Sequence, residues 1–357
     1  MRVGTVLPVQ DWRQCGPAAQ QAEALGLDLV QTNENRHEPF VPLAMAALAT
    51  TRVELATSVA IAFPRSPMIV ASMAWELARH SQGRFVLGLG TQVRAHNERR
   101  FSVPWVAPAA RMAEYIGALR AIWRCWETGG PLDYQGEHYR FSLMNEGFSP
   151  GPNHLPCPPI TLAAVGPLML RNAARLCDGV RLHSFATRAY IEQQVEPVLR
   201  KGLEEAGRPR EHFEVSGGGF VATGPDAEAV REAAEWVRRR VAWYASTPAY
   251  RTVLEPHGLE GLGAKLSVMA RRGEFDAMAA LIPDEVLYLF AAIGPYEEIA
   301  ARIEERFGGL VDTISLSFPE GSAPDGMRRV VEAVQRIPRR FQGFRTEDLR
   351  AGAAAAA

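Results

Sequence analysis

The chain has 357 residues, of which 47% are hydrophobic, and a formal net charge of −1. This composition allows a sizeable core, while a nucleic-acid or membrane-surface role would need a basic excess that the chain lacks. No apolar run reaches the roughly 18 residues of a membrane span, the N-terminus has no signal-peptide layout, and the four cysteines lack a C-x-x-C spacing. We therefore expect a cytoplasmic protein with neither a nucleic-acid nor a membrane partner.

Strand-like apolar runs alternate with helical stretches along most of the chain. The expected strands are residues 3–7, 29–31, 53–61, 85–89, 160–164, 179–182, 213–222 and 313–318. The expected helices are residues 17–25, 42–49, 68–80, 111–127, 168–176, 226–243 and 327–337. Such alternation means parallel strands joined by crossover helices, and eight repeats favour a barrel because a closed sheet leaves no edges. The predicted fold is α/β, a (β/α)8 TIM barrel formed as one domain by residues 1–340.

Insertions after strands 4 and 7 interrupt this rhythm. They cover about residues 91–110, 128–158 (which include a short hairpin signal) and 244–290. Each could form a wall or lid of a substrate pocket, and a passive or dimer-forming role is an equally open alternative. Residues 341–357 end in a low-complexity alanine run, and we expect them to form a flexible tail.

The second and third expected strands both end in candidate site residues. Glu34, Asn35 and His37 follow the second strand, near the presumed catalytic face. The Thr57–Ser58 pair lies near the end of the third strand and is a weak signal by itself. Arg65 follows in a loop between two prolines, where it could meet an anion or a neighbouring subunit.

The fourth strand gives a stronger signal, because the buried run Arg84-Phe-Val-Leu-Gly-Leu-Gly90 turns abruptly polar from Thr91 to Arg100. Parallel barrels build active sites at this face, from loops that follow buried strands. Thr91 and His96 are the candidate residues of this loop. The pattern predicts an enzyme.

The fifth strand stops at Gly166, and Pro167 opens the next helix at the position that proline prefers. The free N–H groups of Leu168 and Met169, with the helix dipole behind them, would form a phosphate site. The segment is neither a Walker loop nor a G-x-G-x-x-G fingerprint, and a plain strand–helix turn is the alternative.

Other kinds of chemistry lack a motif in this sequence. His96 and His183 have no partner at metal-ligand spacing, so we expect no bound metal. A G-x-S-x-G nucleophile elbow is absent as well. Polar strand ends with a phosphate cradle instead suit a bound organic cofactor that carries out the chemistry.

Three segments together resemble the bacterial-luciferase-like family of flavin and deazaflavin oxidoreductases, in particular its coenzyme F420-dependent branch. They are Ala56–Val59, Gly83–Thr91 and Ala163–Ala174, and the resemblance spans roughly residues 1–340. It implies a non-prolyl cis bond between Ser58 and Val59 that bulges against the ring system. It also implies that the cofactor contacts Glu34, Thr57, Ser58, Val59, Thr91, His96, Ala164, Val165, Gly166, Pro167, Leu168 and Met169.

This sequence departs from the family pattern at the second strand, where F420 enzymes commonly carry an acidic residue followed by histidine. Here Glu34 is followed by Asn35, which cannot titrate. The catalytic candidates are therefore Glu34, which we rank first, His37 and His96.

The resulting expectation is an F420-dependent oxidoreductase that moves a hydride between the deazaflavin C5 and a small organic substrate. The first alternative is an FMN-dependent two-component monooxygenase that a separate cofactor reductase supplies. The second is a non-catalytic ligand-binding barrel. The resemblance further implies a homodimer, with Arg65, Arg94 and Arg181 as candidate partners of an anionic cofactor tail. Trp105, Phe148 and Trp243 hint at an apolar substrate.

Overall fold

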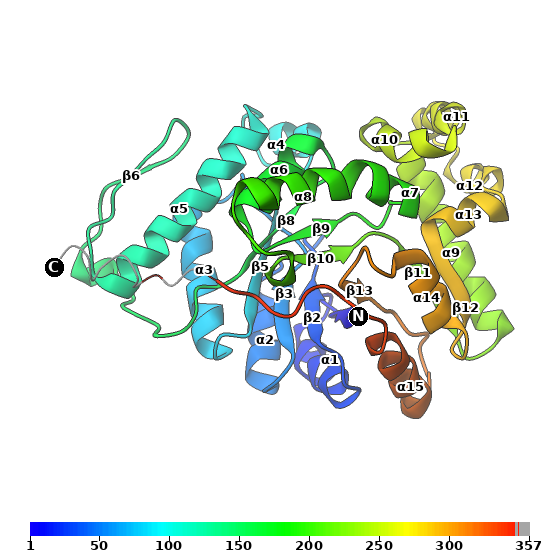
Figure 1. Ribbon diagram of the computed structural model, residues 1–357, viewed down its shortest axis with the longest axis horizontal. Coiled ribbons are helices and arrows are strands. Elements are labelled where there is room, and N and C mark those ends of the chain that lie inside the picture. The colour runs from blue at the N-terminus through cyan, green and yellow to red at the C-terminus, as the bar shows by residue number, and fades with distance from the viewer. Residues whose placement is uncertain (347–348, 350–357) are drawn as a thin grey trace.

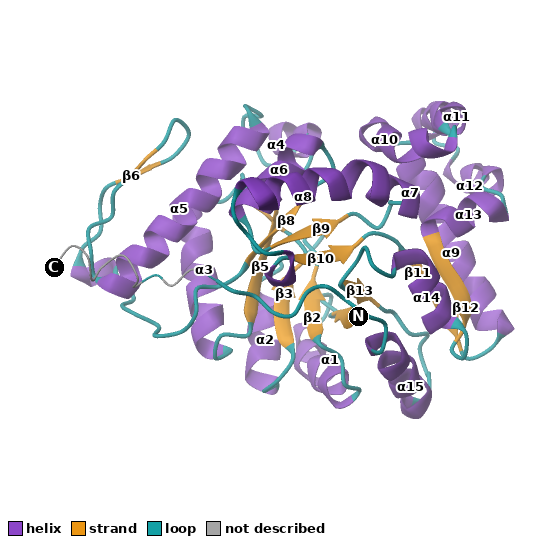
Figure 2. Ribbon diagram, viewed as in Figure 1, coloured by secondary structure: helices purple, strands orange, loops and turns teal. Residues whose placement is uncertain are grey.

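The computed structural model describes residues 1–346 and residue 349. Within them, eight parallel strand positions close into a barrel (Figures 1 and 2). In chain order these are β1 (Arg2–Val6), β2 (Leu29–Thr32), β3 with β4 (Glu54–Thr57, Ala60–Ile61), β5 (Phe85–Gly90), β8 (Ile160–Ala163), β9 (Gly179–Leu182), β10 (Glu214–Gly217) and β13 (Thr313–Ser315). Pairing of β3 with β5 closes the ring. The predicted TIM barrel is confirmed.

Helices surround the barrel and cover the outer faces of its strands (Figure 2). They are α1 (Trp12–Ala24), α2 (Val41–Ala49), α3 (Pro67–His80), α5 (Pro108–Thr128), α6 (Pro167–Leu176), α8 (Glu196–Glu205), α14 (Ile299–Phe307) and α15 (Pro324–Gln335). Helix α1 begins five residues before the expected start at Pro17, because the Asp11 side chain accepts the N–H of Arg13 and caps the helix there.

Residues 213–222, expected as one strand, form parts of two sheets. Gly217 and Gly218 have φ values of 87° and 89° and interrupt the run, so only β10 stays in the barrel. A Cβ on Gly217 would lie 2.3 Å from the Leu182 carbonyl oxygen, which leaves no room for a side chain. Strand β11 (Phe220–Gly224) instead pairs in parallel with β12 (Ala291–Pro295), a strand that the sequence pattern did not reveal.

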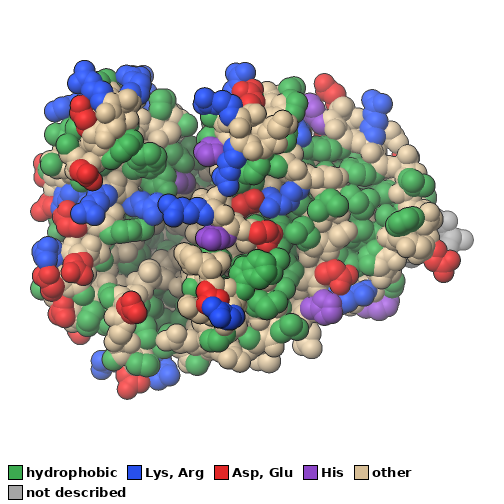
Figure 3. Space-filling view, turned by 180° about the vertical axis from the view of Figure 1, so that it is seen from behind, with side chains coloured by type: hydrophobic (Ala, Val, Ile, Leu, Met, Phe, Trp, Pro, Cys, Tyr) green, Lys and Arg blue, Asp and Glu red, His purple; other side chains and the backbone are tan. Residues whose placement is uncertain are grey.

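The chain between β10 and β13 thus builds a lobe beside the barrel, at the right of Figure 1. We call residues 220–295 the β11–β12 lobe. Its helices are α9 (Ala227–Ala245), α10 (Arg251–Leu254), α11 (Glu260–Arg271), α12 (Phe275–Met278) and α13 (Asp284–Phe290). The Asp226 side chain caps α9 by accepting the N–H of Ala229. Seen from behind, where the lobe lies on the left, a hollow separates it from the barrel (Figure 3).

The shorter elements lie mostly in the loops between the main ones. The hairpin of β6 (Tyr134–Gln135) and β7 (Arg140–Phe141) follows α5, as the sequence predicts, and projects at the left of Figure 1. The remaining helices are α4 (Arg94–Arg99), α7 (Arg188–Tyr190) and single turns at Glu146–Phe148, Ile191–Val195, Arg210–His212, Pro248–Tyr250, Glu255–His257 and Ala279–Leu281. No helix in the described part of the chain is both long and apolar enough to cross a membrane.

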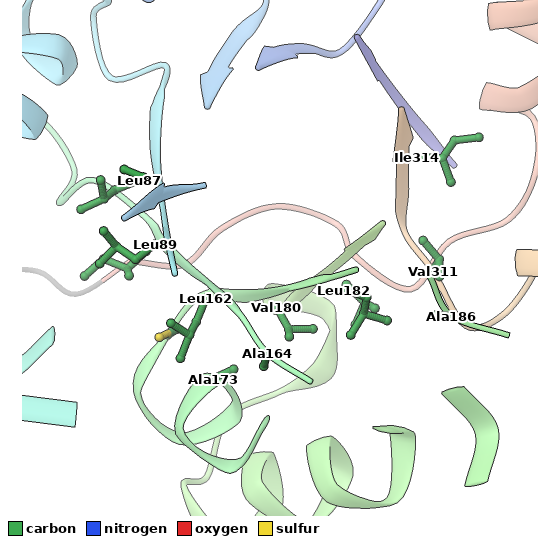
Figure 4. Close-up of a cluster of buried hydrophobic side chains, with 14 of the residues drawn as sticks. Leu87, Leu89, Leu162, Ala164, Ala173, Val180, Leu182, Ala186, Val311 and Ile314 are labelled. Carbon is green, nitrogen blue, oxygen red and sulfur yellow. The ribbon is translucent and has the colours of Figure 1, made fainter. Parts of the chain in front are cut away.

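The main core lies between the strands and the surrounding helices. Figure 4 shows Leu162 of β8 and Val180 of β9 directed toward Ala173 of α6, with Leu87 and Leu89 of β5 beside them. All five side chains are fully buried. Burial of one such leucine or valine contributes about 1.5–3 kcal/mol, so this layer holds α6 firmly against the barrel.

The barrel interior is charged at the end where the strands begin. Arg2 contacts Glu54 at 2.7 Å and Glu214 at 2.8 Å, and the ring of Phe341 lies 5.6 Å from the Arg2 guanidinium carbon. Phe341 is 3% exposed, and its N–H donates to Asp312. The packed chain therefore extends past residue 340, where the flexible tail was expected to begin. Residues 347–348 and 350–357 of that expected tail lie outside the described residues.

Candidate active site

A one-residue bulge interrupts the third barrel strand at its mouth end. Ala56 pairs with Val86 and Ala60 pairs with Leu89, so four residue steps on the third strand face three steps on β5. The extra residue falls in the segment from Thr57 to Val59. The peptide bond between Ser58 and Val59 is cis, as the resemblance implies.

Thr57 compensates for the backbone pairing that the bulge removes. Its buried hydroxyl accepts the N–H of Gly88 at 2.8 Å and donates to the Gly88 carbonyl at 2.7 Å. The approach is so close that a Cβ on Gly88 would lie 1.8 Å from the Thr57 carbonyl oxygen. A Cβ on Gly90 would likewise lie 2.7 Å from a methyl group of Val59. The Gly-Leu-Gly sequence of β5 is thus the seat of the bulge.

Glu34 is held by two groups at the end of β4. Its two carboxylate oxygens each accept from one Arg65 nitrogen at 2.8 Å, and one of them also accepts the N–H of Ile61 at 2.6 Å. The Glu34 and Arg65 side chains are only 9% and 18% exposed. A two-pronged pair of this kind is strong and geometrically specific. The structure therefore ties Glu34 to the residues that follow the bulge. Arg65, expected to meet an anion or a neighbouring subunit, has the Glu34 carboxylate as its partner.

The two histidine candidates have a different environment, since His37 and His96 are both exposed. His96 lies on the short helix α4, next to a residue that sequence reasoning missed. Asn97 is fully buried and its side-chain amide donates to the carbonyl of Thr91 at 2.8 Å, so it fixes the backbone of the Thr91 loop. The Asn97 Oδ1 atom has no hydrogen-bond partner among the described residues. An asparagine within a charged run gave no signal of burial.

The N-terminus of α6 is open to solvent. Gly166, Pro167 and Leu168 are exposed, and nothing lies within 4 Å of a Cβ built on Gly166. The Met169 N–H donates to the Gly166 carbonyl at 3.1 Å. Of the two amides expected to be free, only that of Leu168 has no backbone acceptor within residues 1–346. Val165 precedes this end, and its carbonyl accepts the Tyr190 hydroxyl at 2.8 Å.

Arg181 lies inside the barrel, below its mouth. Its Nε atom donates to the Thr161 hydroxyl at 2.8 Å, and a second nitrogen lies 3.4 Å from the Gln31 side-chain oxygen and 3.5 Å from the Ser216 hydroxyl. Because burial disfavours the charged form, the pKa of Arg181 is lowered from its ordinary value. Arg94, in contrast, forms an exposed pair with Glu98.

The three aromatic residues proposed as hints of an apolar substrate do not form one cluster. Trp105 packs edge-on against Phe63 at 6.0 Å, and Trp243 packs against Phe275 at 5.2 Å. Phe148 is 80% exposed. A different aromatic group, which includes Tyr244 and Tyr250, surrounds His183 at the end of β9.

One group of side chains has the composition of a metal site, formed by Glu114, Glu137 and His138. The Glu114 carboxylate, however, already accepts the backbone N–H groups of Glu137, His138 and Tyr139. These bonds anchor the hairpin on α5 and lower the pKa of Glu114, with burial acting in the opposite direction. We therefore interpret Glu114 as the anchor of the hairpin.

Comparison with known proteins identifies the family. Residues 1–313 match the family model described as luciferase-like monooxygenase. An uncharacterized protein of Mycobacterium tuberculosis is 44% identical over 312 residues, which cover 87% of this chain and 92% of that protein. The 5,10-methylenetetrahydromethanopterin reductase of Archaeoglobus fulgidus is 28% identical over 316 residues, with 87% and 90% covered.

Solved structures share the fold at low sequence identity. The coenzyme F420-dependent tetrahydromethanopterin reductase of Methanopyrus kandleri superimposes with a TM-score of 0.76 at 20% identity, covering 94% of this chain and 98% of that one. The oxygenating constituent of 3,6-diketocamphane monooxygenase from Pseudomonas putida, in complex with FMN, gives a TM-score of 0.65 at 16% identity, with 97% and 100% covered. Because the family model matches most of the chain, this protein belongs to the luciferase-like monooxygenase family and is an oxidoreductase.

Proposed function

We propose that this protein is an F420-dependent oxidoreductase that transfers a hydride between the deazaflavin C5 and a small organic substrate. The observation that carries the proposal is the pairing of two features at the carboxyl ends of parallel strands. One is the bulge after Thr57, seated on Gly88 and Gly90, and the other is the open N-terminus of α6 at Gly166. The name of the F420-dependent reductase from Methanopyrus supports F420 as the cofactor.

The bulge fits a planar ring system. Ser58 and Val59 are half-buried, while Thr57 before them and Ala60 after them are buried. Of residues 57–60, the bulge therefore presents Ser58 and Val59 as the part that a ligand in the mouth could touch. Thr57 would support it from behind, and Thr91 and His96 would flank the ring at the end of β5.

The N-terminus of α6 fits a phosphate. A free amide at Leu168, an exposed Gly166 with open space at its Cβ position and the positive end of a ten-residue helix are together suited to an anion. Ala164, Val165, Pro167 and Met169 would complete this cradle.

In this account F420, when bound, supplies the hydride-carrying carbon, and the chain supplies position and protons. Glu34 would act through Arg65 as a positioning group for the β4 end, since both of its oxygens are already engaged. In this proposal Glu34, which the sequence ranks first, comes after the two histidines as a candidate proton donor. His37 and His96, which are exposed and able to exchange protons with solvent, become the first candidates.

A homodimer also belongs to this proposal. Apolar side chains are exposed on two neighbouring barrel helices, Leu48 of α2 at 76% and Ile69 of α3 at 56%. Contacts between α2 and α3 place these helices side by side. Together with a cytoplasmic location, a dimer would match the expectation from the family, and sedimentation analysis would measure its mass.

The alternative is an FMN-dependent monooxygenase that a separate reductase supplies with reduced flavin. The structural neighbour in complex with FMN favours it. Titration of the purified protein with F420 and with FMN, followed by the change in cofactor fluorescence, separates the two functions. We expect saturable micromolar binding of F420 and much weaker binding of FMN. Micromolar binding of FMN with none of F420 would contradict the proposal.

A further inference from the structure

His183 lies at the mouth end of β9, on the inner side of the barrel. Arg181, two residues earlier, reaches Gln31 and Ser216 across the barrel interior. Side chains two residues apart along a strand share a face, so His183 lies on the same side, closer to the mouth.

The hydrogen bonding of His183 leaves one nitrogen available. Its Nδ1 accepts the backbone N–H of Phe185 at 2.9 Å, so the neutral ring carries its proton on Nε2. Burial lowers the pKa of His183 to about 4, which keeps the imidazole neutral near pH 7. Nε2 has no acceptor among the described residues. His183 therefore presents a single neutral donor.

Two tyrosines of the β11–β12 lobe pack against this ring. Tyr244 of α9 lies edge-on with its centroid 4.4 Å from that of His183, and Tyr250 lies at 4.7 Å. Their hydroxyls have no hydrogen-bond partner within residues 1–346, and burial raises the pKa of Tyr250 to about 12. Phe185 extends the apolar wall, at 5.6 Å from Tyr250. One cluster of contacting rings thus carries three polar groups that have no hydrogen-bond partner in the described part of the chain.

We propose that His183, Tyr244 and Tyr250 form a substrate subsite for a neutral, apolar carbonyl compound. The carbonyl oxygen accepts the Nε2–H of His183, and the carbon skeleton packs against the tyrosine rings. The ring contacts of His183 within the described chain are to uncharged side chains, so an anionic group would lose hydration there without gaining a partner. This inference rests on the proposed function and names its substrate class.

The test follows the Cε1–H resonance of His183 in the full-length protein, assigned by its loss in His183→Gln. Cyclohexanone is the neutral probe, and cyclohexyl phosphate carries an anion on the same skeleton. We expect a saturable shift of the His183 resonance with cyclohexanone and at least tenfold weaker binding of the phosphate. No saturable shift of any histidine Cε1–H resonance of the wild type, or tighter binding of the phosphate, overturns the proposal even if no variant folds.

Three variants separate a binding role from a structural one. His183→Leu should weaken cyclohexanone binding about tenfold, while His183→Gln, which keeps an N–H donor, should stay within about threefold of the wild type. His80→Leu, an exposed histidine on α3, is the matched control and should bind like the wild type. Equal binding by His183→Leu and the wild type would overturn the proposal.

Failure of this inference is distinguishable from failure of the proposed function. The same variants are titrated with F420, and we expect unchanged affinity because the subsite lies outside the cofactor cradle. If the wild type binds cyclohexanone but not F420, the proposal of F420 as the cofactor is contradicted. Intact F420 binding without the His183 shift would contradict only the subsite.

Discussion

A substitution at Gly166 tests most directly whether the N-terminus of α6 binds the cofactor phosphate. It occupies the N-cap of α6 with open space around its Cα, so an aspartate fits there and is itself a preferred cap. We predict that Gly166→Asp leaves the unfolding temperature unchanged or raised, yet weakens F420 binding at least tenfold, because its carboxylate repels the phosphate. Fluorescence titration and thermal unfolding measure the two effects.

The matched control is Gly261→Asp, at an exposed glycine of α11 that also has open space around it. It should bind F420 like the wild type. An unchanged affinity in Gly166→Asp would remove the α6 end from the cofactor site, while a drop in both variants would indicate a general charge effect.

The pair of Glu34 with Arg65 stabilises the end of β4. Glu34→Gln replaces one charged oxygen by an amide group that must face the donors of Arg65 and Ile61, and it leaves a partly buried guanidinium poorly paired. We predict a loss of about 1–3 kcal/mol in the free energy of unfolding. Urea unfolding of Glu98→Gln, in the exposed pair with Arg94, should show roughly 0.5 kcal/mol or less. Equal losses in the two variants would mean that the Glu34–Arg65 pair stabilises the fold no more than an exposed ion pair does.

For some site residues the residue type alone indicates the structural role, and for others the role depends on contacts between distant parts of the chain. Two glycines in a buried strand are typical of a close approach of another backbone, so the residue type alone was enough to predict the role of Gly88 and Gly90. The partner of Glu34 was not visible, since Arg65 lies 31 positions away and meets it only through the barrel. Asn97 was missed for the same reason, because its burial depends on how α4 folds back over Thr91.

Among the elements, the bulged third strand depends on one hydroxyl. Thr57→Val has nearly the same shape but leaves the N–H and carbonyl of Gly88 without the bonds that Thr57 provides. We predict a loss of about 1–3 kcal/mol for each orphaned group. Thr57→Ser keeps the hydroxyl and should lose only about 1 kcal/mol from the missing methyl group. Urea unfolding compares them, and equal losses would show that the hydroxyl does not hold the bulge.

Hydrophobic periodicity predicted the positions of the barrel strands, but it did not reveal where the chain leaves the barrel. The eight expected strands all lie at barrel positions, because buried parallel strands have distinctive apolar runs. Residues 213–222 show the limit, since their apolar run continues through three glycines that turn the chain out of the barrel. Strand β12 was missed because its partner β11 is more than sixty residues earlier in the chain.

At the scale of the whole molecule, the segment after α15 closes the end of the barrel opposite the mouth. Phe341 packs beneath Arg2 and is 3% exposed. We predict that Phe341→Ala lowers the free energy of unfolding by about 3–5 kcal/mol, because the cavity opens onto the buried ion pairs of Arg2. Phe148→Ala, at an 80% exposed phenylalanine, should change it by about 0.5 kcal/mol or less. A small loss in Phe341→Ala would show that this segment merely lies against the barrel.

In the proposed function, the bulge after Thr57 and the N-terminus of α6 together seat one cofactor. A crystal structure of the protein soaked with F420 tests it most directly. We predict the deazaflavin ring against Ser58 and Val59 and the phosphate within hydrogen-bonding distance of the Leu168 N–H. A ring bound elsewhere in the barrel mouth, or a phosphate that avoids α6, would contradict the account.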